Sequence, residues 1–457
     1  MGSAILDFIV DVLSQPSILV ALIAMTGLLL LKKPAQDVIK GTVKTCLGFL
    51  VLSGGATILQ GALLPFGTMF QEAFNVTGVV PNNEAIVAMA LTEFGTATAL
   101  IMAFGMIANI VIARITPMKY IFLTGHHTLY MACMIAVILY VSGLRGVALI
   151  ATGAVTLGLI MAAFPAIAQP FMKKITGNDS VALGHFSTTG YVLSGLVGKL
   201  VGKGSRSTEE LNLPKGLGFL RDSSITIALT MTILYVVVAL FCGPTFIESE
   251  LSGGTNFIVY SVIQAVTFAA GVYIILAGVR LILAEIVPAF KGFSDKLVPN
   301  SKPALDCPIV FPYAPNAVLL GFFCSFIGGI VGMAILGWAG AVIILPGVVP
   351  HFFCGAAAGV FGNATGGIRG CTIGSFVNGL LITFLPVFLL PVLGDLGFAN
   401  TTFSDADFGV SGIVLGSVSN WIGSTGIIVF VIAALAIAIA SGFFMKKHKE
   451  EETHKAA

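Results

Sequence analysis

Long apolar stretches alternate with short basic or glycine-rich segments along most of the sequence. A helix needs about 20 apolar residues to cross the hydrocarbon core of a bilayer. Measured against that length, the pattern predicts membrane-spanning helices at 17–31, 45–64, 85–112, 120–142, 145–168, 222–243, 256–284, 317–346, 352–364, 372–394 and 410–444. The pattern therefore predicts an all-α polytopic membrane protein with about 11 transmembrane helices.

Two segments depart from this pattern. Residues 180–200 are rich in Ser, Thr and Gly and have basic residues on both sides, which is typical of a re-entrant segment that enters and leaves on one side. Residues 303–321 contain four prolines that cannot all lie within one regular helix. Interrupted segments of this kind point to the binding site of a transporter. Their similar lead-ins indicate an internal duplication, and the sequence leaves its orientation open.

The composition agrees with a membrane protein. Hydrophobic residues make up 57% of the chain and charged residues 10%, whereas soluble domains carry about 25% charge. This excludes a soluble enzyme, a nucleic-acid-binding protein and a disordered chain. Seven cysteines form no CxxC pair, so we expect them to be free thiols that pack within the membrane.

The basic residues predict the orientation, because Lys and Arg are enriched in cytoplasmic loops. A cluster follows the first predicted span at Lys32 and Lys33, and the tail 446–457 carries another. We therefore expect the N-terminus outside and the C-terminus in the cytoplasm. This requires an odd number of crossings, about eleven or alternatively nine. The expected division is a transmembrane domain over 1–445 and a polar cytoplasmic tail over 446–457.

A few ionisable residues fall within the apolar or interrupted segments, where such groups are costly and usually functional. His126 and His127 lie about two turns into the span predicted from Tyr120, His185 lies in the first interrupted segment, and Asp306 opens the second. Imidazoles and carboxylates can together bind hydroxyl groups, so this set suits a polyhydroxylated ligand. The alternative is that each histidine bonds only to a neighbouring helix.

Polar residues at 82–84 begin another span, and Glu84 is either part of the site or an N-terminal cap of that helix.

The sequence has no Walker-type loop, zinc-protease motif or nucleophile elbow. We therefore expect no catalytic residue, no cofactor and no metal, and the energy for any transport must come from an ion gradient or a separate partner.

Several runs resemble the membrane subunit, component IIC, of the bacterial ascorbate-type phosphotransferase system (PTS). They are KGTVKTCLGFLVLSGG (40–55), ARITPMKYIFLTGH (113–126), LPKGLGFLRDSSITIALTMTI (213–233), GVRLILAEIVPAFKGFSDKLVPNSKPALDC (278–307), YAPNAVLLGF (313–322) and ILPGVVPHFF (344–353). The similarity extends from about residue 15 to the tail.

The resemblance implies a homodimer in the bacterial cytoplasmic (inner) membrane, each subunit having a substrate-holding core with broken hairpins and a dimerising part. It implies uptake of L-ascorbate or a related sugar, sugar acid or polyol. The phosphocysteine of component IIB then phosphorylates the substrate, and component IIA supplies IIB. In this family the IIC chain itself carries no phosphorylated residue.

The resemblance also implies substrate-binding positions. His126, His185 and Asp306 match ascorbate-binding positions of the family, and His127 adjoins the first of them. At four further candidate positions the residues differ. Tyr130 and Phe186 stand where the family has glutamines, and Asn83 and Glu84 fall at a Thr-Tyr position.

Other functions remain open at this point. A proton- or sodium-coupled secondary transporter on a similar scaffold would use Glu84, Glu93 and the histidines as a relay. A passive channel or a membrane scaffold is a third hypothesis. The basic stretch 199–221 is a candidate docking surface for a cytoplasmic partner, as is 291–302, and the alternative for both is binding of anionic lipid headgroups.

Overall fold

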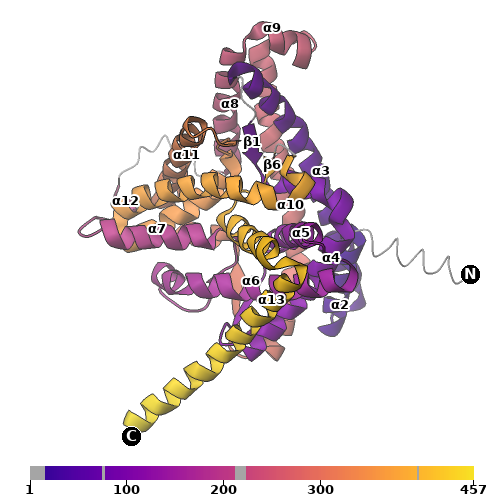
Figure 1. The fold of residues 1–457 in the computed structure, drawn as a ribbon, viewed down its shortest axis with the longest axis vertical. Coiled ribbons are helices and arrows are strands. Elements are labelled where there is room, and N and C mark those ends of the chain that lie inside the picture. Colours follow the sequence, from indigo (N-terminus) through magenta and orange to yellow (C-terminus); the bar gives the residue numbers. More distant parts are fainter. Residues whose placement is uncertain (1–15, 75–77, 212–222, 399–400, 457) are drawn as a thin grey trace, which may run out of the picture.

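The computed structural model describes residues 16–74, 78–211, 223–398 and 401–456, which are mostly helical (Figure 1). The helices of ten or more residues are α2 (Pro16–Leu30), α3 (Ala35–Phe74), α4 (Asn83–Ile115), α5 (Gly125–Val141), α6 (Gly146–Thr176), α7 (Thr188–Val201), α8 (Ser223–Cys242), α10 (Phe257–Leu297), α11 (Pro315–Trp338), α12 (Val348–Leu389) and α13 (Ala406–Ala456). Shorter helical turns are η1 (Thr208–Glu210), α9 (Pro244–Phe246), η3 (Ile247–Leu251), η4 (Cys307–Tyr313), η5 (Leu390–Val392) and η6 (Gly394–Phe398).

The helices confirm a multi-pass membrane protein. Among the described residues, five helices are each long and apolar enough to cross a bilayer. A sixth candidate is a pair of helices, 231–242 and 244–251, bent by 103°. Helix α3 is also long, with 40 residues, and contains Pro65.

Two small parallel sheets lie among the helices. Their strands are β1 (Gly78–Pro81), β2 (Tyr120–Phe122), β3 (Ala182–Leu183), β4 (Lys302–Leu305), β5 (Ile343–Ile344) and β6 (Thr401–Thr402). One sheet has the order β5-β1-β6 and the other β2-β4-β3. The middle strand of each sheet comes from one half of the chain and its two outer strands come from the other half. The two halves are thus interlocked by backbone hydrogen bonds.

This topology corrects two expectations. The sequence predicts helices only, because strands of two to four residues are too short to show an alternating pattern. The internal duplication also relates different segments from the two that the sequence suggested. By their places in the sheets, β4 corresponds to β1 and β3 corresponds to β6. The interrupted segments 180–200 and 303–321 are therefore neighbours in one sheet and not equivalent members of two repeats.

Glycines break two of the long helices. In α12, Gly366 and Gly367 leave helical geometry, with φ of 57° at Gly367, and in α13 Gly423 has φ of 69°. Such positive φ values favour glycine. The break in α12 lets its first half pack along α7, where Ser194 Oγ donates to the Ala358 carbonyl at 2.7 Å. Figure 1 shows α7 and α12 side by side at the left of the molecule.

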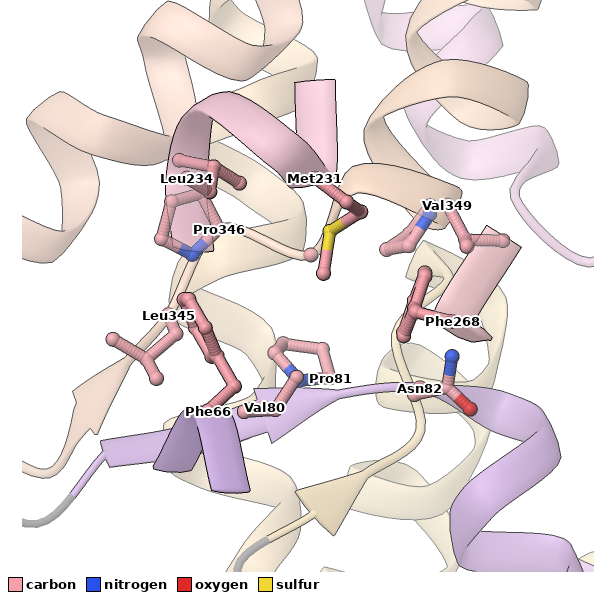
Figure 2. A pocket seen from close by; sticks show the side chains of 12 residues that line it. Phe66, Val80, Pro81, Asn82, Met231, Leu234, Phe268, Leu345, Pro346 and Val349 are labelled. Atoms are coloured by element: carbon pink, nitrogen blue, oxygen red, sulfur yellow. The ribbon is translucent and has the colours of Figure 1, made fainter. Parts of the chain in front are cut away.

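A second group of helices, α2, α3, α8 and α10, packs mainly within itself. Tyr235 of α8 packs against Phe66 of α3 with ring centroids 4.8 Å apart and the rings tilted by 50°, and the Tyr235 hydroxyl donates to the Ala62 carbonyl. A small pocket lies where this group meets the sheet that contains β1 (Figure 2). Its lining joins Phe66, Met231 and Phe268 to residues that follow β1 and β5.

An exposed ion-pair cluster fixes the start of the second sheet. Asp179 lies 2.6 Å from the Lys302 ammonium and 2.9 Å from that of Lys173, and Gln169 donates to it at 2.8 Å. The Lys302 ammonium, helped by Lys173 and Gln169, holds the pKa of the Asp179 carboxyl below its ordinary value. The ion pairs therefore stabilise the folded protein at neutral pH. This contribution is lost as the pH falls below the usual pKa range of a carboxyl group.

Two glycines of α12, Gly355 and Gly359, permit close contact with α11. A Cβ atom added to Gly359 of α12 would lie 2.8 Å from Gly321 Cα of α11 and would meet the Ala317 carbonyl. We predict that Gly359→Ala lowers the melting temperature in detergent, because overpacking typically costs about 1–3 kcal/mol. Gly61→Ala on α3 is the control, since nothing lies within 4 Å of its added Cβ. Equal stability of the two variants would contradict this packing.

Candidate functional site

Polar side chains gather where the two sheets end. Asn83 follows β1, His126 and His127 follow β2, His185 follows β3, Asp306 follows β4 and Asp405 follows β6. In each sheet the strands are parallel, so their carboxyl ends meet at one edge. The helices that follow begin close to these ends, so several helix N-termini surround the same place.

The central cluster consists of His126, His127, His185, Asp306 and Asp405. His126 Nε2 lies 3.6 Å from Asp306 Oδ2, and His127 Nε2 lies 3.9 Å from Asp405 Oδ2. His185 Nε2 stands between the two carboxylates, 3.9 Å from Asp306 Oδ1 and 3.7 Å from Asp405 Oδ2. Three imidazoles and two carboxylates from both halves of the chain therefore face one another.

Hydrogen bonds orient Asp405 within the cluster. Its Oδ1 accepts from Asn83 Nδ2 at 2.8 Å and from Ser404 Oγ at 2.7 Å. Asn83 Oδ1 in turn accepts from the Ser404 backbone N–H at 2.9 Å. These bonds occupy one carboxylate oxygen and leave Oδ2 directed at His127 and His185.

A second aspartate, Asp407, fixes the segment that carries His185. Its carboxylate accepts from the Thr188 N–H at 2.7 Å and the Thr189 N–H at 2.8 Å, at the first turn of α7. Its own backbone N–H donates to the Phe186 carbonyl at 2.9 Å. The start of α13 is therefore bonded directly to the start of α7, and Asp407 is a positioning residue.

The structure brings His126, His127, His185 and Asp306 together and places Asn83 against Asp405. One detail differs from the expectation. His126 and His127 lie in the first turn of α5 and not two turns into a helix, because β2 replaces the predicted beginning of that helix. Asp306 is the most accessible member of the cluster, with 32% of its side chain exposed.

The remaining predicted site residues lie at the edge of the cluster. Tyr130 is buried, its ring centroid is 5.8 Å from that of His126, and its hydroxyl has no hydrogen-bond partner among the described residues. Glu84 is half-buried in the first turn of α4. The Phe186 ring stacks on Phe122. The Phe186 backbone N–H donates to His127 Nδ1 at 3.4 Å.

The sequence analysis missed Asp405 and Asp407. Both lie in the run FSDADF between two predicted spans, and a residue in a connecting loop carries no expected cost. The available signal was their spacing. Asp405 and Asp407 are two residues apart and directly precede an apolar segment that contains glycine. Acidic residues in this position are typical of the start of a helix.

The cluster contains residue types that can bind a metal ion. Three groups of ligand atoms lie close enough to hold an ion, one of them formed by His127, His185 and Asp405. However, His127 Nδ1 accepts a backbone N–H, so the neutral ring carries its proton on Nε2. A metal needs a nitrogen lone pair, whereas this nitrogen is a donor aimed at a carboxylate. The two groups that contain His127 therefore fit a hydrogen-bonded ligand better than an ion, and the third group consists of His185, Asp306 and Cys307.

Two cavities elsewhere are less suitable for a polar ligand. The pocket of Figure 2 has a volume of about 20 Å³, which holds a single water molecule. A larger groove of about 410 Å³ lies between α6 and α13, and nearly all its lining is aliphatic or aromatic. The central cluster combines hydroxyl acceptors, donors and the unpartnered Tyr130 hydroxyl, so its chemistry suits a polyhydroxylated molecule.

The two halves of the chain are interlocked, several segments are interrupted, and a polar cluster lies at their centre. Together these features are typical of a membrane transporter. The family model described as PTS system sugar-specific permease component (EIIC-GAT) matches residues 11–407, a range that contains the whole central cluster. The chain therefore belongs to this family.

A curated relative supports the same assignment. The chain is 26% identical over 423 residues to a protein named ascorbate-specific PTS system EIIC component from Mycoplasma pneumoniae. The match covers 81% of this chain and 64% of the relative. The chain thus matches less than two thirds of that protein's length.

We predict that Asp407→Ala loosens the His185 segment, because two backbone N–H groups at the start of α7 lose their acceptor. Hydrogen exchange of the Thr188 and Thr189 amides should become faster, while the amides in the middle of α4 keep their rates. Asp395→Ala is the control, since Asp395 is exposed in η6. Unchanged exchange at Thr188 and Thr189 would show that Asp407 does not hold this segment.

Proposed function

We propose that this protein is the membrane-embedded sugar permease of a phosphoenolpyruvate-dependent phosphotransferase system. The observation that carries the proposal is the central cluster, in which residues from both halves of the chain surround one place. Its carboxylates accept hydrogen bonds from hydroxyl groups, and its imidazole N–H groups donate hydrogen bonds, as a sugar-like ligand requires. The family membership supplies the class of transport.

The transport step requires two cytoplasmic partners, components IIB and IIA. The permease binds the substrate from outside, encloses it and exposes it to phosphorylated IIB. The P–S bond of the phosphocysteine breaks and a P–O bond to a substrate hydroxyl forms. The hydroxyl proton passes to water and the cysteine leaves as a thiolate, so the chain itself needs no catalytic nucleophile.

The proposed substrate is L-ascorbate or a related sugar, sugar acid or polyol. The name of the Mycoplasma relative favours ascorbate. Tyr130 offers one hydroxyl, and Phe186 offers no side-chain donor and has its backbone N–H bonded to His127, where the ascorbate-type family has glutamines. A buried ligand hydroxyl left without a partner costs about 1–3 kcal/mol, so these two positions favour a ligand with a different set of hydroxyls.

The proposed topology has eleven crossings in the cytoplasmic membrane. They are α2, α3, α4, α5, α6, α8, α10, α11, the two halves of α12, and α13 beyond Gly423. The β3–α7 segment enters and returns on the cytoplasmic side. Basic residues near the ends of α2, α4, α6 and α10 support this orientation. The group formed by α2, α3, α8 and α10 is the proposed dimerising part of a homodimer.

An ion-coupled transporter is the second candidate. The buried contact of Asp405 with His127 and His185 favours it, since such chains can relay protons. The two functions differ in what drives uptake. Group translocation requires phosphorylated IIB, whereas coupled uptake requires only a gradient.

We predict that vesicles containing the purified protein accumulate phosphorylated substrate only when phosphorylated IIB is present. His185→Ala and Asp306→Asn should lose substrate binding by at least about tenfold, because each removes a hydrogen-bonding partner worth about 1.5–3 kcal/mol. Isothermal titration with L-ascorbate, pentoses and pentitols measures the binding.

Glu93→Gln is the matched control, because Glu93 is exposed on α4 away from the cluster. Its affinity should equal that of the unmodified protein. Gradient-driven uptake without IIB would contradict group translocation. Full affinity in either cluster variant would remove that residue from the site.

The orientation gives a further prediction. An epitope at the N-terminus should react in intact cells, and one at the C-terminus only after the membrane is permeabilised. Basic clusters retained in the cytoplasm are the physical reason. Reaction of both epitopes on the same side would require an even number of crossings and would overturn the proposed topology.

A further inference from the structure

The end of α7 and the break in α12 meet at a basic surface. The segment 202–211 that follows α7 lies on the break, where the Ile368 N–H donates to the Arg206 carbonyl at 2.8 Å. The Arg369 N–H donates to Ser205 Oγ at 3.2 Å. A Cβ on Gly367 would meet the same Arg206 carbonyl, so only glycine permits this contact. The break thereby fixes Arg369 beside a segment about 160 residues earlier in the chain.

Three exposed side chains, Lys203, Arg206 and Arg369, form what we call the cationic rim. Within the described residues, none of them takes part in an ion pair. Lys173 and Lys302 differ, because both are paired with Asp179. The rim therefore presents three positive charges without ion-pair partners to an anionic partner, beside two exposed acidic residues of the same loop, Glu209 and Glu210.

Hydrogen bonds connect the rim to the segment that leaves the central cluster. Glu209 Oε1 accepts from the backbone N–H groups of Asn316 at 2.9 Å and Ala317 at 3.2 Å. Asn316 Nδ2 donates to the carbonyls of Thr208 and Leu211, each at 3.1 Å. The segment that begins at Asp306 thus ends on the same loop that carries Arg206.

We propose that the cationic rim is the docking surface for the phosphorylated face of component IIB. This rests on the proposed function, which requires IIB to deliver a phosphoryl group on the cytoplasmic side. Guanidinium groups bind phosphate and carboxylate with two parallel hydrogen bonds, and the rim offers two of them. A partner bound here lies beside the loop that is bonded to the segment beginning at Asp306. The docking surface is therefore next to a segment that leads to the proposed substrate site.

The test is charge reversal in the double variant Arg206→Glu/Arg369→Glu. The control is Lys33→Glu/Lys174→Glu, which reverses two exposed charges outside the rim. Both are reconstituted in phosphatidylcholine vesicles and titrated with phosphorylated IIB of an ascorbate-type system, measuring phosphoryl transfer and IIB binding. Substrate affinity, measured separately, reports on folding.

The rim variant should raise the KM for phosphorylated IIB at least tenfold, weaken its salt dependence and keep the substrate affinity. The control should behave as the unmodified protein, and Arg206→Lys/Arg369→Lys should recover part of the loss. An unchanged KM in the rim variant, or an equal loss in the control, would overturn the proposal.

Three further outcomes are informative. A defect seen only in vesicles containing phosphatidylglycerol would assign the rim to lipid headgroups, against the proposal. Binding of phosphorylated IIB to the rim without transfer would retain the docking surface and contradict the transport function. Failure of the unmodified protein to bind IIB at all would contradict both.

Discussion

Pairing of backbone groups between the two halves of the chain is the constraint on which this structure depends. Within a bilayer, an interrupted helix exposes N–H and C=O groups that have no water to bond. Here the interruptions are two small sheets, and the middle strand of each belongs to the opposite half from its outer strands. Neither half can satisfy its own interruptions, so the two halves must fold against each other.

The same pairing creates the site. Parallel strands end together, and the next residues face the junction from several directions. His126, His185, Asp306 and Asp405 each follow a different strand. The carboxylate of Asp407, at the start of α13, accepts from two N–H groups in the first turn of α7 and so connects two of these junctions directly. The carboxylates lie near helix N-termini, which favour negative charge. The central cluster is therefore a consequence of the interlocked topology and not of any single helix.

The sequence predicted much of this site and little of its architecture. His185 and Asp306 were found because they are ionisable residues in segments that glycine, serine or proline interrupts, and His126 because it is ionisable within a predicted apolar span. Asp405 was missed because its role depends on Asn83, which lies 322 residues earlier. The strands were missed because β3, β5 and β6 have two residues each and are stabilised by distant partners. The resemblance to a known family identified the class of protein, and the comparisons confirmed it.

Locating the bound ligand is the most direct test of the central cluster. Cryo-electron microscopy of the protein with L-ascorbate, or with the tightest-binding pentitol, would show where the ligand lies. We predict ligand density enclosed by His126, His185, Asp306 and Asp405. Density in the groove between α6 and α13, or elsewhere away from the ends of the two sheets, would contradict the account.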